Sequence, residues 1–181
     1  MNPQLTYWLA LAVALGTSVG SVVLSLGLQL AACPLCYYQR SFAFASLGVL
    51  GVGLITGMQQ HICLAGLVLP LALTGLLLAG YHASLEARGK MECPLGLTQT
   101  LTAPQESVLA FVVLSGLLVT CTLSEDKPGG GWVAIALAAL LAVVLAVSSV
   151  ASVAMPAPPK PETYQSPPKT CRPLPPPAVV G

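Results

Sequence analysis

The segment Cys33–Arg40 has the sequence CPLCYYQR and lies between two long apolar runs. Its two cysteines, Cys33 and Cys36, have the spacing of a redox dithiol. A thiol becomes a nucleophile only as the thiolate, and a nearby cation or helix N-terminus lowers its pKa. Arg40 follows Cys36 by four residues, and we expect a helix to start near Cys36. The segment therefore predicts thiol chemistry beside an apolar helix.

The composition indicates a membrane protein. Hydrophobic residues make up 55% of the 181 residues, and charged residues make up only 7%. A soluble domain carries about 25% charged residues, so this chain could not cover the surface of a soluble globule. Uncharged apolar runs of about 18 residues or more predict transmembrane helices. The net charge is +1 and no basic patch is present, which argues against nucleic acid as a partner.

The order of apolar runs predicts an all-α integral membrane fold. A four-helix transmembrane bundle is expected over residues 1–123, a turn and a fifth transmembrane helix over 124–154, and an extended proline-rich C-terminal tail over 155–181. The four core helices are expected at about residues 5–32, 41–57 (extended back over Tyr37 and Tyr38), 62–84 and 107–123.

Successive membrane helices alternate direction, and this sorts the cysteines. The loops that hold Cys33, Cys36 and Cys93, and the tail that holds Cys171, all fall on one face of the membrane. The remaining two cysteines fall near the opposite face, where we expect them to act as small packing residues. These two are Cys63 and Cys121.

Two arguments about the orientation of the protein in the membrane disagree. Most basic residues lie on the face with four cysteines, which by the positive-inside rule would be cytoplasmic. Stable disulfides belong instead to oxidising compartments outside the cytoplasm. We adopt the redox argument, because Glu86, Glu92 and Glu106 offset the basic residues and the tail is not a short loop. The basic residues concerned are Arg40, Arg88, Lys90, Lys160, Lys169 and Arg172, with Lys127 opposite.

The Cys33–Cys36 pair also allows two other interpretations. The pair could be half of a zinc site, with His82, Cys93 or Cys171 as further ligands. Residues 30–33 also look like a lipoprotein cleavage site, but the preceding segment lacks a basic start and its apolar run is too long for a signal peptide. We expect no metal.

The motif CPLCYYQR resembles the first-loop motif of the DsbB/BdbC family of membrane disulfide-bond formation proteins. The resemblance covers roughly residues 5–123 and includes the position of the motif after the first helix. It implies a thiol:quinone oxidoreductase of the bacterial cytoplasmic membrane. Such an enzyme oxidises a soluble thioredoxin-fold dithiol protein, similar to DsbA, and passes two electrons to a membrane quinone. By resemblance Cys36 faces the quinone, Arg40 helps to hold it, and His82 lies near it.

The second loop departs from the family pattern. In the family this loop holds two cysteines, whereas here it holds only Cys93. We predict that Cys171 of the tail is the missing partner and that these two form the second redox pair. The alternatives are a purely structural disulfide, or a Cys171 that stays free while Cys93 pairs with Cys33 or with another protein.

A non-enzymatic function is the main competing hypothesis. The extra helix, the absent loop cysteine and the proline-rich tail would also suit a structural or assembly subunit that docks through its tail in a larger membrane complex. An unpaired Cys93 and the lack of a quinone-sized pocket at Cys36 would favour that hypothesis. Electron flow in the reverse direction is a third possibility, because residue identities do not set the redox potential.

Overall fold

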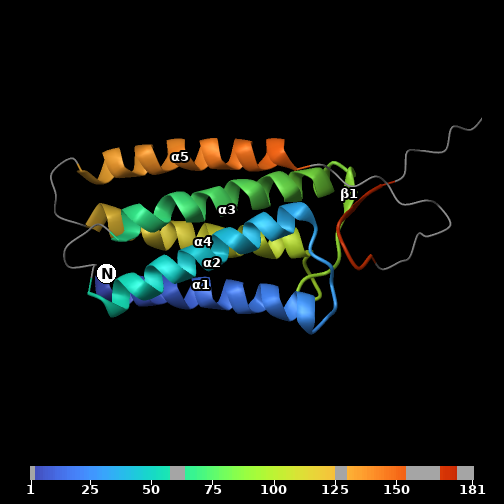
Figure 1. Ribbon diagram of the computed structural model, residues 1–181, viewed down its shortest axis with the longest axis horizontal. Coiled ribbons are helices and arrows are strands. Elements are labelled where there is room, and N and C mark those ends of the chain that lie inside the picture. The colour runs from blue at the N-terminus through green and yellow to red at the C-terminus, as the bar shows by residue number, and fades with distance from the viewer. Residues whose placement is uncertain (1–2, 58–63, 125–129, 154–167, 175–181) are drawn as a thin grey trace, which may run out of the picture.

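Five long helices make up most of the protein. The computed structural model describes residues 3–57, 64–124, 130–153 and 168–174. The helices are α1 (Pro3–Leu26), α2 (Pro34–Ile55), α3 (Leu64–Ala87), α4 (Ala103–Ser124) and α5 (Gly130–Ser152). They lie side by side along the long axis of the molecule (Figure 1). The predicted all-α membrane bundle is confirmed.

Four of the helices form a closed ring, and the fifth lies outside it. Helix α1 packs on α2, α2 on α3, α3 on α4, and α4 back on α1. Helix α5 packs mainly on α3, with a smaller contact to α4 (Figure 1). Helix α3 therefore touches three neighbours, and it buries more of its span than α1, α4 or α5.

Small residues let these helices approach closely. A side chain on Gly75 of α3 would overlap the ring of Phe111, which is fully buried on α4.

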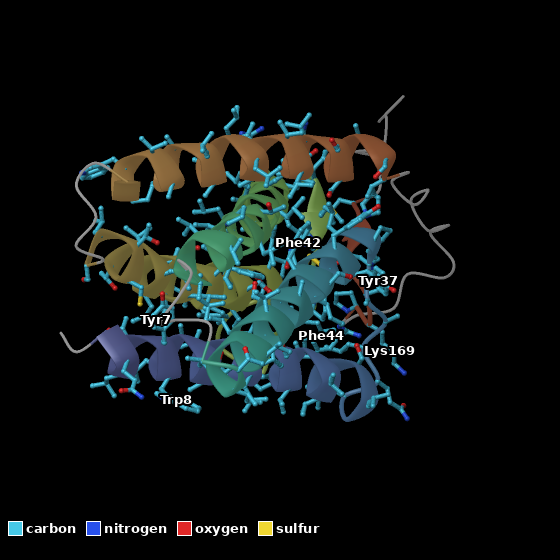
Figure 2. All side chains as sticks on the ribbon, turned by 60° about the vertical axis from the view of Figure 1, so that its left-hand side comes forward. Tyr7, Trp8, Tyr37, Phe42, Phe44 and Lys169 are labelled. Carbon is cyan, nitrogen blue, oxygen red and sulfur yellow. A yellow bond between two sulfur atoms is a disulfide. The ribbon has the colours of Figure 1, made fainter. Side chains whose placement is uncertain are left out.

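On α1 the two adjacent aromatic side chains, Tyr7 and Trp8, point in different directions, as Figure 2 shows. Tyr7 is buried and its hydroxyl accepts a hydrogen bond from the backbone N–H of Ala65 at 3.3 Å, whereas Trp8 is half exposed on the outer face. Cys121 lies in the same buried core, as expected for a packing residue, while Cys63 lies outside the described residues.

Among the described residues, four helices are long and apolar enough to cross a membrane: α1, α3, α4 and α5. Helix α2 is 22 residues long but is not among them, because Gln39 and Arg40 lower the hydropathy of its first turns. The outer face of α5 exposes large apolar side chains, which suits contact with lipid. These side chains include Trp132, Leu137, Leu140, Val144 and Val147.

The helix boundaries nearest the cysteine motif differ from those we expected. Helix α2 begins at Pro34, near Cys36 as the motif predicts but before residue 41, where the apolar run starts, because proline suits the first helical position and Cys33 forms the N-cap. Helix α1 ends at Leu26, and Gln29 has a φ of 52°, in the left-handed region that interrupts a helix. The chain between Leu26 and Pro34 is therefore a loop and not the last turns of a span.

The described part of the tail is tied to both cysteine loops. Strand β1 (Met91–Glu92) pairs antiparallel with β2 (Arg172–Pro173), with Glu92 opposite Arg172. The N–H of Ala31, in the first loop, donates to the carbonyl of Lys169 at 2.9 Å. The rest of the predicted tail, residues 154–167 and 175–181, lies outside the described residues.

Candidate functional site

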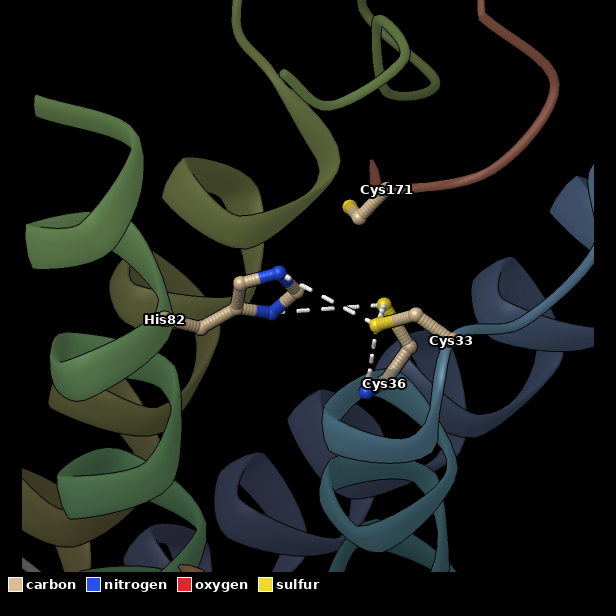
Figure 3. Close-up of side chains that lie close together, drawn as sticks. All are labelled: Cys33, Cys36, His82 and Cys171. Atoms are coloured by element: carbon tan, nitrogen blue, oxygen red, sulfur yellow. Dashed lines mark hydrogen bonds between the residues drawn. The ribbon is translucent and has the colours of Figure 1, made fainter. Parts of the chain in front are cut away.

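Four cysteines and one histidine gather at one end of the bundle. Cys33 and Cys36 come from the start of α2, His82 from the last turns of α3, Cys93 from the loop after β1, and Cys171 from the tail. Figure 3 shows His82 pointing from α3 toward the thiols of α2. The site is mostly enclosed, because Cys36 is the only one of the five that is not fully buried.

The local fold of the motif holds Cys33 and Cys36 together. As the N-cap of α2, Cys33 turns its sulfur back over the first helical turn, where it accepts the N–H of Cys36 at 3.2 Å. The Sγ atoms of Cys33 and Cys36 are 2.9 Å apart and share a hydrogen bond. The helix N-terminus that we expected to act on Cys36 therefore acts first on Cys33.

This arrangement makes Cys33 an acidic thiol. The hydrogen bond from the Cys36 side chain makes the largest contribution, and His82 and the Cys36 N–H add to it. Together they outweigh burial, which acts in the opposite direction, and lower the pKa of Cys33 to about 5. Cys33 is thus a thiolate at neutral pH, the form that attacks disulfides and leaves from them readily.

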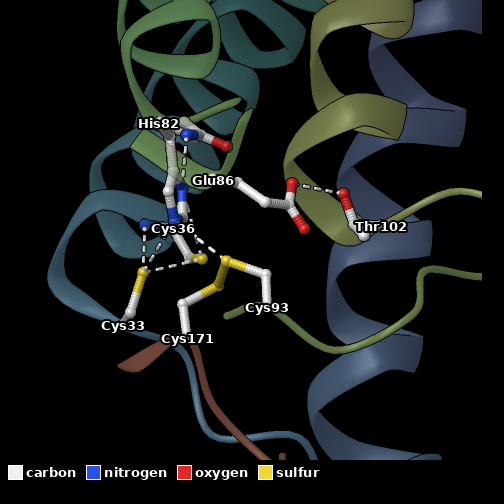
Figure 4. Close-up of a disulfide and its surroundings, with 8 residues drawn as sticks. Cys33, Cys36, His82, Glu86, Cys93, Thr102 and Cys171 are labelled. Atoms are coloured by element: carbon white, nitrogen blue, oxygen red, sulfur yellow. Dashed lines mark hydrogen bonds between the residues drawn. A yellow bond between two sulfur atoms is a disulfide. The ribbon is translucent and has the colours of Figure 1, made fainter. Parts of the chain in front are cut away.

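Cys93 and Cys171 form a disulfide across 78 residues of sequence (Figure 4). The pairing of β1 with β2 brings the two segments of the chain together immediately before Cys93 and immediately after Cys171. The Arg172–Glu92 ion pair, at 3.2 Å, adds a contact next to the bond. The structure brings together the two cysteines that we predicted as a pair, and in it Cys33 is not bonded to Cys93.

His82 lies between the two cysteine pairs. Its Nε2 atom is 3.4 Å from the sulfur of Cys93 and 3.9 Å from that of Cys33. Its Nδ1 atom is 3.3 Å from the side-chain nitrogen of Gln39 and 4.0 Å from the sulfur of Cys36. With the Gln39 amide donating to Nδ1, the proton sits on Nε2 and faces the sulfurs of Cys93 and Cys33.

A cavity of about 290 Å³ opens beside the dithiol, between α1, α2 and α4. Its lining is largely apolar and includes Cys36, Arg40, Phe111 and Cys171. One nitrogen of the Arg40 guanidinium donates to Ser25 and, at 2.8 Å, to the carbonyl of Ser21, both on α1. Arg40 Nε is buried and, among the described residues, has no hydrogen-bond partner. His82 is not among the described residues that line the cavity.

Sequence reasoning missed several residues that position this site. Gln39, which orients His82, lies three residues after Cys36 and so falls on the same helix face. That spacing could have singled it out. Ser21 and Ser25, which hold Arg40, lie in an apolar run and carry no comparable signal.

A known protein family matches the larger part of this chain. The family model described as "Disulfide bond formation protein DsbB" matches residues 3–114. The chain belongs to the DsbB family. The matched part of this DsbB-family chain holds Cys33, Cys36 and Cys93 but ends before α5 and Cys171.

Curated relatives carry a corresponding name. A "Probable disulfide formation protein" of Chlamydia muridarum is 34% identical over 129 residues, which cover 66% of this chain and 93% of the relative. A protein of the same name from Chlamydia trachomatis serovar D is 35% identical over 115 residues, 58% of this chain and 83% of the relative. No solved structure matches significantly. Family membership and the apolar helices support a multi-pass membrane protein of disulfide bond formation.

Proposed function

We propose that this protein is a thiol:quinone oxidoreductase that reoxidises a soluble thioredoxin-fold dithiol protein. Electrons pass from the partner to the Cys93–Cys171 disulfide, then to the Cys33–Cys36 pair, and finally to a membrane quinone. One observation carries the proposal: Cys36 touches both the cavity and Cys33, and His82 contacts both pairs. A continuous series of contacts therefore leads from the Cys93–Cys171 disulfide, through His82 and the Cys33–Cys36 pair, to the cavity.

The first two steps are thiol–disulfide exchanges. The partner dithiol reduces the Cys93–Cys171 disulfide and leaves with its own two thiols oxidised to a disulfide. A thiolate of the reduced Cys93–Cys171 pair then attacks Cys33 of an oxidised Cys33–Cys36 pair, and Cys36 is released as a thiol. The second thiolate of the pair closes the Cys93–Cys171 disulfide and expels Cys33. The low pKa of Cys33 makes it a good leaving group in this last exchange.

His82 stabilises the thiolates that form in these exchanges. The proton on its Nε2 atom faces one sulfur of each pair, so the imidazole can donate a hydrogen bond to the thiolate of Cys33 or of Cys93 as the disulfides exchange. Gln39 holds the ring in position through Nδ1. In this role His82 acts between the two cysteine pairs and not in the cavity.

The residues that line the cavity suit a quinone. The lining is mainly apolar, as a quinone ring requires, and the buried Nε of Arg40 lacks a partner among the described residues and could donate to a quinone oxygen. A bound quinone would accept the two electrons that the pair loses on closing to a disulfide, with one proton from the thiol of Cys36 and a second from solvent. Arg40 and the thiol of Cys36 would hold it against α1 and α4.

The redox site is proposed to face the extracytoplasmic side of the bacterial cytoplasmic membrane. Cys33, Cys36 and Cys171 lie close together and Cys171 is bonded to Cys93, so a single compartment serves both pairs. A disulfide such as Cys93–Cys171 persists in an oxidising compartment. Cysteine labelling with a membrane-impermeant reagent in intact cells would test this orientation.

The proposal is tested by quinone reduction with purified protein and dithiothreitol. Cys36→Ser should reduce the rate to the level without protein, because no disulfide can form beside the cavity. Cys121→Ser is the matched control, since Cys121 lies in the core of α4 away from the site, and it should keep the wild-type rate. Full activity of Cys36→Ser would contradict the proposal.

A structural or assembly subunit remains the competing function. Two features expected of such a subunit, an unpaired Cys93 and the lack of a cavity at Cys36, are not what the described residues present. An inactive protein in the dithiothreitol assay that co-purifies with a membrane complex would favour it.

A further inference from the structure

The cysteine cluster has the composition of a zinc site as well as of a redox relay. The sulfurs of Cys33, Cys36 and Cys171 and one ring nitrogen of His82 all lie within 4.8 Å of one another (Figure 3). Three thiolates and one imidazole are a common ligand set of tetrahedral zinc. In the structure this set is incomplete, because the sulfur of Cys171 is bonded to Cys93.

The spacing of the four atoms is close to what zinc requires. With Zn–S bonds of about 2.3 Å and Zn–N bonds of about 2.0 Å, tetrahedral ligand atoms lie roughly 3.5–3.8 Å apart. Cys33 Sγ and His82 Nε2 are 3.9 Å apart, near this value, whereas the sulfurs of Cys33 and Cys36 are closer, at 2.9 Å. The two sulfurs must separate by about 1 Å. Rotation of the partly exposed Cys36 side chain can supply that change.

The surroundings support this use of His82. If Nε2 binds the metal, Nδ1 carries the proton and needs an acceptor. The side-chain amide of Gln39, 3.3 Å away, can present its oxygen after a flip of the amide.

We propose that the fully reduced protein binds one thiophilic divalent cation, Zn²⁺ or a chemical equivalent, through Cys33, Cys36, Cys171 and His82. Binding replaces the protons that the ligand thiols still carry, and these protons are released to solvent. Exchange with an external disulfide, which takes the two electrons and leaves as two thiols, forms the Cys93–Cys171 disulfide and removes one ligand, so this oxidation expels the ion. The site is therefore controlled by the redox state of the tail disulfide.

The inference goes beyond the electron relay and predicts how the relay is blocked. Metal-bound Cys33 and Cys36 cannot close to a disulfide, so the ion would hold the protein in its reduced form. Reduction of both pairs at once is the state expected when thiol reductant is abundant and the electron acceptor is scarce. The metal would then lock the protein only under those conditions.

The test compares two serine variants that break the same disulfide. Cys93→Ser leaves Cys171 as a thiol, whereas Cys171→Ser removes the ligand itself. Both are titrated with Co²⁺ and Zn²⁺ in detergent, without quinone, after reduction with tris(carboxyethyl)phosphine, which is not a thiol ligand. All proteins carry Cys63→Ser and Cys121→Ser, so that no other cysteine contributes. The readouts are the thiolate-to-cobalt charge-transfer band and competition by Zn²⁺.

Reduced protein with all four site cysteines, and Cys93→Ser, should bind one ion with the spectrum of tetrahedral cobalt, and the oxidised protein should not. Cys171→Ser should weaken binding by more than the roughly 10–100-fold that loss of an outer hydrogen-bond partner costs. Equal binding by the two serine variants, or by the oxidised and reduced proteins, would overturn the proposal. Because no quinone is present, either result is independent of whether Cys36→Ser abolishes quinone reduction.

Discussion

The two cysteine pairs of this protein are held in place in different ways. Cys33 and Cys36 are three residues apart, and the first turn of α2 alone sets their geometry. Cys93 and Cys171 are 78 residues apart and meet through two short strands and an ion pair. The first pair is therefore intrinsic to the bundle, whereas the second depends on the tail reaching its place. A fixed pair suits the cavity, and a pair on a loop and a tail suits exchange with another protein.

The largest expected effect comes from removing the tail cysteine. Cys171→Ser should lower oxidation of the reduced dithiol partner by about 10³-fold or more, the scale of losing a covalent nucleophile. Quinone reduction driven by dithiothreitol should change far less, because the small dithiol can reduce Cys33–Cys36 directly. Thr170→Ala is the neighbouring control and should leave both rates unchanged. Equal loss of both activities would contradict the division of labour between the pairs.

Arg40 tests the cavity beside the intrinsic pair. A charge-assisted hydrogen bond contributes about 1.5–3 kcal/mol, so Arg40→Met should raise the KM for quinone by roughly 10–100-fold. Steady-state kinetics at varied quinone concentration measure this change. Arg40 also bonds to α1, and Ser25→Ala removes the side-chain part of that attachment while Arg40 stays in place. A KM that rises as much in Ser25→Ala as in Arg40→Met would assign the effect to helix packing.

The acidity of Cys33 follows from its neighbours within the same pair. The thiolate should be populated above a pH of about 5 and be lost as the pH falls through this value. Cys36→Ala removes the largest cause and should raise the pKa of Cys33 strongly, toward its ordinary value of 9.0. His82→Ala should raise it less. Titration of the thiolate absorbance, with Cys63 and Cys121 replaced by serine, measures both; an unchanged midpoint in Cys36→Ala would refute this origin.

The smallest effect is expected at the ion pair beside the tail disulfide. Arg172 and Glu92 are both partly exposed, so their pair contributes about 1 kcal/mol or less. Glu92→Gln should therefore speed reduction of Cys93–Cys171 by dithiothreitol by at most about 5-fold. Glu86→Gln, outside the ion pair, should have no effect. A much larger change in Glu92→Gln would mean that the ion pair, and not the strands, holds the tail.

The helices were predictable because uncharged apolar runs identify them without reference to their neighbours. Their contacts were not, since helices that are apolar all round carry no periodic pattern that marks the buried face. For this reason Ser21 and Ser25, the anchors of Arg40, were missed. The motif predicted the start of α2 near Cys36, but the apolar run alone placed it at residue 41, and the N-cap gave no further signal because cysteine is not among the usual capping residues.

The site was predictable where counting helices was sufficient. Alternating spans placed Cys93 and Cys171 on the face of Cys33 and Cys36, and the family pattern suggested their pairing. The strands that dock the tail were not foreseen, because two-residue strands leave no alternating pattern. The position of His82 between the pairs, and not in the cavity, depends on the packing of α3 against α2 and could not be read from spacing.

The central claim is that the Cys33–Cys36 pair alone delivers electrons to quinone. It is tested most directly by single-turnover quinol yield from two reciprocal double variants, each fully reduced and freed of reductant. The account predicts that Cys93→Ser with Cys171→Ser yields one quinol per chain as the Cys33–Cys36 disulfide forms, and that Cys33→Ser with Cys36→Ser yields none. Quinol from the second variant, or none from the first, would contradict it.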